Sequence, residues 1–250
     1  MLRRGATLAI GWALAVMAIT LFTWLGTWQY GRQHEKQAML DAAAQVLAQR
    51  DARPLALAAD PDAADGYTWA AGDGQWADAP AVLLDNQQRN GRPGVRVYRL
   101  FEPAAGEPLL VELGWLPVPA DRSIPAITDP PPAPPLEGLL LPPPSAGLAA
   151  AAIQPQADGS LLLMALDRQA VAAALGREAI APRVLRLDPD AAGGYARDLE
   201  ILPNTLPPEK HLGYAVQWFG LALTVLVTAL ILTFRRRRAH SGNHRHSRHP

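Results

Sequence analysis

The chain has 250 residues, which is enough for a pair of membrane helices and one globular domain. Its formal net charge of zero hides a strong asymmetry, because all 23 acidic residues lie between Glu35 and Glu209. Only 15 of the 23 basic residues lie between Arg32 and Lys210, so this middle segment carries −8 and the two ends together carry +8. Such segregation indicates that the ends and the middle meet different surroundings. The absence of cysteine excludes a disulfide framework, a thiolate metal site and a cysteine nucleophile.

The first apolar stretch predicts a transmembrane helix over residues 6–28. No charged residue occurs from Gly5 to Gly31, and a helix needs about 20 apolar residues to cross the hydrocarbon layer. Arg3 and Arg4 precede the stretch and aromatic residues close it, as is typical of the inner and outer boundaries of a span. The alternative is a cleaved signal peptide, but the apolar run is longer than the core of such a peptide and no A-x-A cleavage pattern follows it.

A second apolar stretch predicts another transmembrane helix over residues 211–234. Four consecutive arginines, Arg235 to Arg238, follow it and mark the cytoplasmic side under the positive-inside rule. We therefore expect residues 1–5 and 235–250 in the cytoplasm and residues 29–210 outside it. Either stretch alone could instead be the core helix of a soluble protein, but two such runs with correctly placed arginines favour membrane spans.

The segment between the spans changes from a helical period to strand alternation. Good helix formers with apolar residues three and four apart predict a helix over residues 32–50. Alternation over residues 109–115 predicts a strand with one buried face, and Asn90-Gly91 predicts a hairpin turn. Asp167 is placed to cap a short helix over residues 167–175. Further strands are expected at residues 66–76, 81–84, 95–101, 136–141, 160–165 and 179–187.

These patterns predict a membrane protein, in which a two-helix transmembrane hairpin carries a β-rich α+β extracytoplasmic domain between its N- and C-terminal spans. Prolines between residues 130 and 135 indicate a stiff extended crossing, for which a rigid spacer is preferred over a ligand site. The tail contains His240, His244, His246 and His249. It could bind a metal, but nothing apolar there could order it, which favours a solvated cytoplasmic tail.

Patterns typical of catalysis are scarce. The sequence contains no G-x-S-x-G, H-E-x-x-H, Walker or G-x-G-x-x-G motif, and its Asp-Pro-Asp sequences are typical of turns. We therefore expect a protein that is not an enzyme.

The most informative polar residues lie where the two predicted spans meet the outer boundary. On the first span they are Trp28, Gln29, Arg32 and Lys36, and on the second they are His211, Tyr214 and Trp218. Residues three, four and seven apart share one face of a helix, so the two faces could meet in a hairpin. An imidazole below several cations suits an amphipathic ligand with carboxylates, such as haem, whose iron binds imidazole and whose propionates bind Arg or Lys. The alternative is that these residues are interface anchors.

Four motifs in chain order resemble the signatures of the SURF (surfeit-locus) family of cytochrome c oxidase assembly proteins. They are Leu25-Gly26-Thr27-Trp28-Gln29 with Arg32 and Lys36, Asn90-Gly91-Arg92-Pro93-Gly94, Leu110-Val111-Glu112-Leu113-Gly114-Trp115-Leu116-Pro117, and His211-Leu212-Gly213-Tyr214-Ala215-Val216-Gln217-Trp218-Phe219. One departure is clear: the family usually has arginine where Leu113 stands. By alternation we expect Leu113 to face the core.

The resemblance implies a cytochrome c oxidase assembly factor that binds haem a transiently, with His211 as the candidate ligand of the haem iron. It implies the oxidase catalytic subunit, the haem a synthesis machinery and membrane lipid as partners, with no nucleic acid. Composition favours the inner membrane of a bacterium. Three alternatives remain. One is a scaffold that never binds haem. The others are a membrane-anchored enzyme, for which the sequence shows no catalytic constellation, and a copper-handling protein, for which it has no suitable ligands outside the tail.

Overall fold

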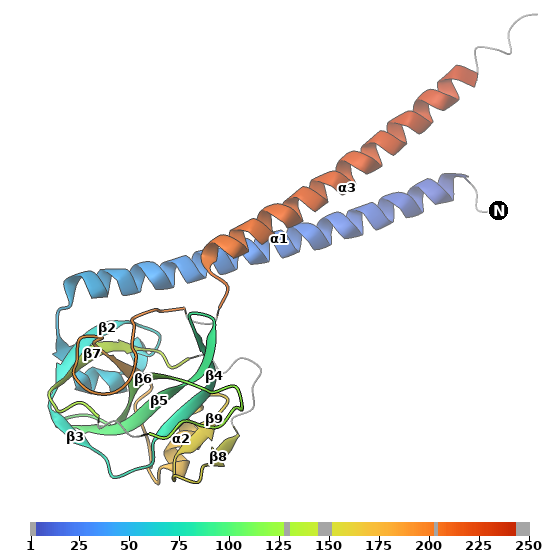
Figure 1. Ribbon diagram of the computed structural model, residues 1–250. Coiled ribbons are helices and arrows are strands. Elements are labelled where there is room, and N and C mark those ends of the chain that lie inside the picture. The colour runs from blue at the N-terminus through green and yellow to red at the C-terminus, as the bar shows by residue number, and fades with distance from the viewer. Residues whose placement is uncertain (1–3, 128–130, 145–151, 203–204, 244–250) are drawn as a thin grey trace, which may run out of the picture. The chain divides into compact units, whose positions relative to one another are not determined.

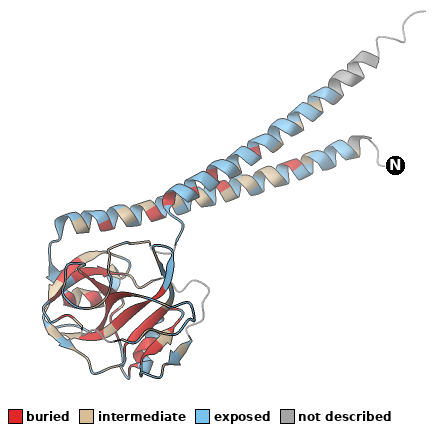
Figure 2. Ribbon diagram, viewed as in Figure 1, coloured by how far each residue is buried: buried red, intermediate tan, exposed pale blue. Residues whose placement is uncertain are grey.

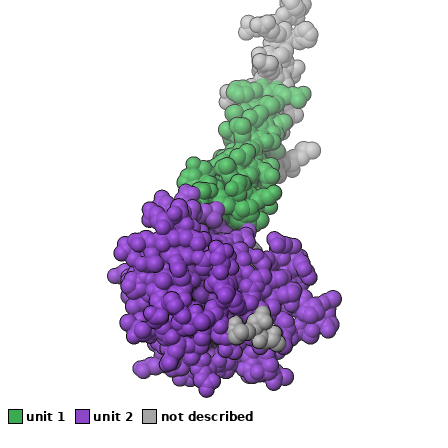
Figure 3. All heavy atoms as spheres, turned by 60° about the vertical axis from the view of Figure 1, so that its left-hand side comes forward, with its two compact units in different colours: residues 1–39, 206–250 green, residues 40–205 purple. Residues whose placement is uncertain are grey.

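A computed structural model describes residues 4–127, 131–144, 152–202 and 205–243, with side chains between residues 6 and 235 of these ranges. The chain forms two compact units (Figure 3). One unit comprises residues 1–39 and 206–250, and the other comprises residues 40–205. The prolines from Pro131 to Pro135 lie in the connection between two strands, whereas Pro130 and the last seven residues of the histidine-rich tail lie outside the described residues.

The first unit is a hairpin of two long helices that run side by side in opposite directions (Figure 1). Helix α1 covers Arg4–Gln49 and helix α3 covers Pro208–Asn243. Both contain a stretch that is long and apolar enough to cross a membrane. The two long apolar helices are thus confirmed. The helix predicted over residues 32–50 is the continuation of α1 without a break.

The two helices pack along a seam of residues spaced alternately three and four apart, the period of antiparallel coiled coils. On α1 the seam includes Ala15, Phe22, Gly26, Gln29 and Lys36, and on α3 it includes His211, Ala215, Trp218 and Ala222. Small residues let the helices approach closely. A Cβ atom at Gly26 would lie 2.7 Å from the ring of Phe219, so any larger residue there would require that ring to move.

The second unit is built on one mixed sheet, and its described residues form ten strands (Figure 1). The strands are β1 (Arg53–Pro54), β2 (Thr68–Gly72), β3 (Gly74–Trp76), β4 (Val82–Arg89), β5 (Arg92–Pro103), β6 (Leu109–Pro117), β7 (Leu136–Leu141), β8 (Ile153–Pro155), β9 (Leu161–Leu163) and β10 (Val184–Leu187). Their order is β1-β2-β7-β10-β6-β5-β4-β9-β8, with β3 paired to β5. Two 3-10 turns, Leu55–Ala59 and Pro61–Ala63, follow β1.

Both faces of the central strands are buried (Figure 2). One apolar cluster contains Leu109, Val111 and Leu113, and a second contains Leu110. The prediction that residues 109–115 bury only one face is therefore wrong, because covering segments lie over both sides of β6. The core position predicted for Leu113 is confirmed, since its side chain is fully buried.

The hairpin turn and the helix cap occur where the sequence predicts them. Asn90 and Gly91 both adopt positive φ in the β4–β5 turn, which confirms the predicted hairpin. Helix α2 covers Arg168–Ala174, and the Asp167 carboxylate accepts the Ala170 N–H at 2.8 Å as its N-cap. Strand β7 has the predicted bounds, whereas β9 and β10 are shorter than expected and β1 and β8 were not predicted.

Candidate functional site

The candidate site lies on the seam of the helical hairpin, where two polar side chains face each other across α1 and α3. The Nδ1 atom of His211 lies 2.7 Å from the Oε1 atom of Gln29. The His211 side chain is buried, with the residue 8% exposed. Seam spacing explains the encounter, because Gln29 follows Phe22 by seven residues and His211 precedes Trp218 by seven.

The hydrogen bond that His211 donates to Gln29 assigns a tautomer to the imidazole. A carboxamide oxygen can only accept, so Nδ1 carries the proton and donates it, and Nε2 keeps its lone pair. The Nε2 atom is buried and has no hydrogen-bond partner among the described residues. Buried polar atoms without partners are rare in native structures, so such an atom points to a ligand or a rearrangement. Protein atoms cover Nε2 here, so a ligand reaches it only when the covering side chains move.

Lys36 lies next along the same face of α1, seven residues after Gln29. Its side chain is buried, and Nζ donates a hydrogen bond to the Leu206 carbonyl oxygen, just before α3 begins. Burial lowers the pKa of Lys36, and the neighbouring charge of Arg32 lowers it further. The hydrogen bond to Leu206 holds the Lys36 amine close to the start of α3, on the same seam as His211.

The other predicted site residues are placed differently. Arg32 is exposed and forms an ion pair with Glu35, with 2.6 Å between its Nη1 and the carboxylate oxygen. Trp28 and Tyr214 are 51% and 41% exposed and lie off the seam. Trp218 is half-buried and packs against Phe22 with ring centroids 5.6 Å apart. The structure thus brings together Gln29, Lys36 and His211 of the predicted set.

Sequence reasoning missed the Leu206 carbonyl and the small seam residues. Gln29 and Trp28 are adjacent, and only one of them can face α3. The signal that separates them is the alternating spacing through Ala15, Phe22 and Gly26, which places Gln29 on the seam. A count of that spacing on both helices would have paired Gln29 with His211.

The β-rich unit contains a buried cluster of charged side chains. Glu112 accepts hydrogen bonds from Arg96, Tyr98 and Arg186, and all four side chains are buried. Arg186 also donates to the Glu200 carbonyl oxygen. Burial and the adjacent Glu112 charge raise the pKa of Tyr98, so its hydroxyl stays protonated. This cluster ties strands β5, β6 and β10 together, and among its described groups the buried Arg96 Nε lacks a hydrogen-bond partner.

Two motifs of the β-rich unit meet at one point. The indole of Trp115 lies over Gly94, where a Cβ atom would clash with the ring, and its Nε1 donates to the Gln87 carbonyl oxygen at 3.1 Å. Gly114 has a φ of +128°, and a Cβ atom there would lie 2.7 Å from the backbone of Tyr195. These glycines allow three backbone segments to approach closely, which is a structural role.

The described residues contain no group of three or more His, Asp or Glu side chains that could hold a metal ion by themselves. A metal at His211 would therefore need other ligands, such as the ring nitrogens that a porphyrin supplies. One protein imidazole suffices for haem iron. The residues on the seam fit that group in chemistry: an imidazole with a free lone pair and a nearby cation.

Comparison with protein families gives a match. The profile of the SURF1 family matches residues 16–223, which include every site residue discussed above and the whole β-rich unit. A comparison with curated proteins finds no match. The SURF1 family is associated with cytochrome c oxidase assembly, and its members are assembly factors rather than catalysts. Because the matched region covers most of the sequence, the chain belongs to the SURF1 family.

Proposed function

We propose that this protein is a membrane-anchored assembly factor for cytochrome c oxidase that holds haem a transiently through His211. The observation that carries the proposal is the Nε2 atom of His211, which is buried and lacks a hydrogen-bond partner in the described part of the chain. Gln29 supports it by keeping the proton on Nδ1. Hydrogen bonds of this kind orient metal-ligating histidines and increase their basicity.

The membrane setting is part of the proposal. Large apolar side chains of both helices face outward, including Leu14, Val16 and Leu223, which are more than half exposed. Such a surface suits lipid rather than water. We assign residues 6–28 and 211–234 to the spans, with both ends in the cytoplasm of a bacterium and the β-rich unit on the opposite side of the inner membrane. The basic residues before the first span and after the second support this orientation.

Each polar residue of the seam receives a distinct role. His211 would hold the haem iron through Nε2, because imidazole is a ligand of haem iron. Gln29 fixes the ring orientation. Lys36 and Arg32 neutralise propionates after exchanging their present partners, the Leu206 carbonyl and Glu35. Because Nε2 is covered, binding requires local opening of the hairpin, which fits a transient carrier better than a permanent haem protein.

The experiment compares haem content in three forms of the full-length protein purified from a host that makes haem a. His211→Ala should lose the bound haem and its visible spectrum. His34→Ala is the matched control, because His34 is exposed on α1 and its described contacts, with Gln33 and Tyr30, lie within its own helix. Equal haem content in wild type and His211→Ala would remove His211 from the ligand role.

A scaffold that never binds haem is the second candidate, and the covered Nε2 atom favours it, because the present conformation offers the iron no access. In that case the protein would stabilise a nascent oxidase subunit and His211 would only pack the seam. Deleting the gene separates the two. A catalytic subunit that accumulates without haem a supports delivery, whereas loss of oxidase with a normally haem-loaded subunit supports the scaffold.

A further inference from the structure

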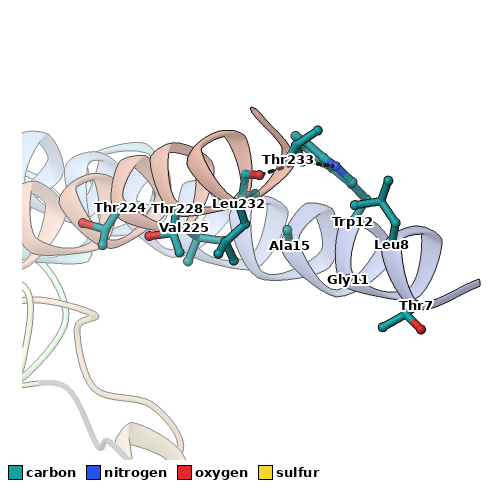
Figure 4. A pocket seen from close by; sticks show the side chains of 11 residues that line it. Thr7, Leu8, Gly11, Trp12, Ala15, Thr224, Val225, Thr228, Leu232 and Thr233 are labelled. Atoms are coloured by element: carbon teal, nitrogen blue, oxygen red, sulfur yellow. Dashed lines mark hydrogen bonds between the residues drawn. The ribbon is translucent and has the colours of Figure 1, made fainter. Parts of the chain in front are cut away.

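A cavity of about 450 Å³ lies between the two helices (Figure 4), and its residues on α3 begin 13 positions after His211. Helix α1 contributes one wall and α3 the other. Its lining residues are Thr7, Leu8, Gly11, Trp12 and Ala15 on α1, and Thr224, Val225, Thr228, Ala229, Leu232 and Thr233 on α3. All of them fall within the proposed spans, so the cavity opens toward lipid rather than water.

Two of the four threonine hydroxyls of the wall, and its indole N–H, have hydrogen-bond partners within the two helices. The hydroxyls of Thr224 and Thr233 both donate to carbonyl oxygens four residues earlier, each at 2.8 Å. The Trp12 Nε1 donates to the Thr233 Oγ1 at 3.0 Å and so links the two helices (Figure 4). An occupant gains few hydrogen bonds from such walls, so the chemistry selects a hydrocarbon.

Size and position narrow the choice of hydrocarbon. A volume of about 450 Å³ lies within the range of small-molecule sites. A further helix, with a diameter of about 10–12 Å, would not fit between α1 and α3. Thr224 follows His211 by 13 residues, which corresponds to about 20 Å along the helix at a rise of about 1.5 Å per residue. A flexible chain attached to a group at His211 can span that separation along the seam.

We propose that this cavity takes the isoprenoid tail of haem a, and so makes the hairpin selective for haems with a farnesyl chain over protohaem. The inference rests on the proposed binding at His211 and adds the substrate class. Protohaem has a vinyl group in place of the tail and would leave the cavity empty. Since lipid is as apolar as the tail, selectivity comes from close packing rather than from exclusion of water.

The test fills the cavity and measures affinity for two haems. Gly11 lines the cavity and a Cβ atom there meets nothing within 4 Å, so Gly11→Leu adds side-chain volume at this wall. Gly220→Leu is the matched control, because Gly220 is equally open, lies in the other span and does not line the cavity. Full-length protein in detergent is titrated with haem a and with protohaem, and binding is followed by visible absorption.

We expect Gly11→Leu to weaken haem a binding by roughly tenfold, the scale of packing effects within membranes, and to leave protohaem binding unchanged. Gly220→Leu should change neither. Equal affinities of the wild type for both haems, or an equal effect of Gly11→Leu on both, would overturn the inference. If Gly11→Leu loses its helical circular dichroism, Thr228→Leu fills the cavity from α3, with Val227→Leu as its exposed neighbour control.

The two proposals fail in different ways. If Gly11→Leu loses the preference for haem a while His211→Ala binds haem as the wild type does, the cavity still takes the tail, but His211 is not the iron ligand. If His211→Ala binds neither haem and the wild type binds both haems equally, His211 is the iron ligand, but the cavity does not select for the tail. A wild type that binds neither haem overturns both.

Discussion

Replacing Glu112 by glutamine removes the one carboxylate that holds the buried charge cluster together. Glu112 is 3% exposed and accepts hydrogen bonds from Arg96, from Tyr98 at 3.2 Å and from Arg186 at 3.2 Å. Glutamine has nearly the same shape as glutamate, but it leaves the buried guanidinium groups of Arg96 and Arg186 without the Glu112 counter-charge. Removing one partner of a buried ion pair costs about 3–5 kcal/mol, so we expect the β-rich unit to lose that much free energy of unfolding.

The assay is urea unfolding of the full-length protein in detergent, followed by the fluorescence of Trp69, Trp76 and Trp115. With a denaturant slope of about 1–3 kcal/mol per molar, the midpoint should fall by at least about 1 M. Glu102→Gln is the matched control, because the Glu102–Arg177 pair lies on the surface of the same unit, at 2.6 Å. Such a pair contributes about 1 kcal/mol or less. Equal midpoints for Glu112→Gln and Glu102→Gln would refute the reasoning.

Two further predictions concern the same unit. Gly114→Ala should destabilise the β-rich unit by about 1–3 kcal/mol, because alanine is strained at a φ of +128° and its Cβ atom would meet the Tyr195 backbone. Gly159→Ala is the control and should cost less, because a Cβ atom at Gly159 meets no neighbour. Thermal unfolding measures both effects. Burial alone would raise the pKa of Asp198, but hydrogen bonds from the Glu200 N–H and Arg89 place the pKa below its usual value. The stability that Asp198 contributes is therefore present above its unfolded-state pKa and is lost as the pH falls through its folded-state pKa. Asp198→Asn should flatten the acid limb of a stability–pH curve, and an unchanged limb would contradict this assignment.

Elements with strong local signals were predictable from the sequence. Strand β7 was predicted with its observed bounds, and Asn90-Gly91 identified the β4–β5 turn because both residues tolerate positive φ. The long apolar runs identified the two helices. By contrast, β1 and β8 have only two and three residues, and their pairing depends on neighbours distant in sequence.

The burial of Glu112 could not be predicted from local pattern. A glutamate that alternates with leucines is typical of a solvent-facing position, yet its partner Arg186 lies 74 residues away on β10. Only the pairing of β10 with β6 brings that counter-charge to it.

The candidate site was partly predictable. Motif positions identified His211, Gln29 and Lys36, but not their contacts. Helical spacing alone placed Tyr214 on the face of His211, whereas the observed seam passes through Ala215, which is buried. The difference arises because a close-packed pair follows a period of 3.5 residues and selects small side chains where the helices approach. That selection depends on the partner helix and is not a property of either helix alone.

The most direct test of the account is chemical rescue of the iron ligand. Full-length His211→Gly should lack the low-spin absorption of an imidazole-bound haem and should regain it when imidazole is added to the solution. His34→Gly should keep the wild-type spectrum throughout. A wild-type spectrum in His211→Gly without added imidazole would show that another group holds the iron, and would contradict the role assigned to His211.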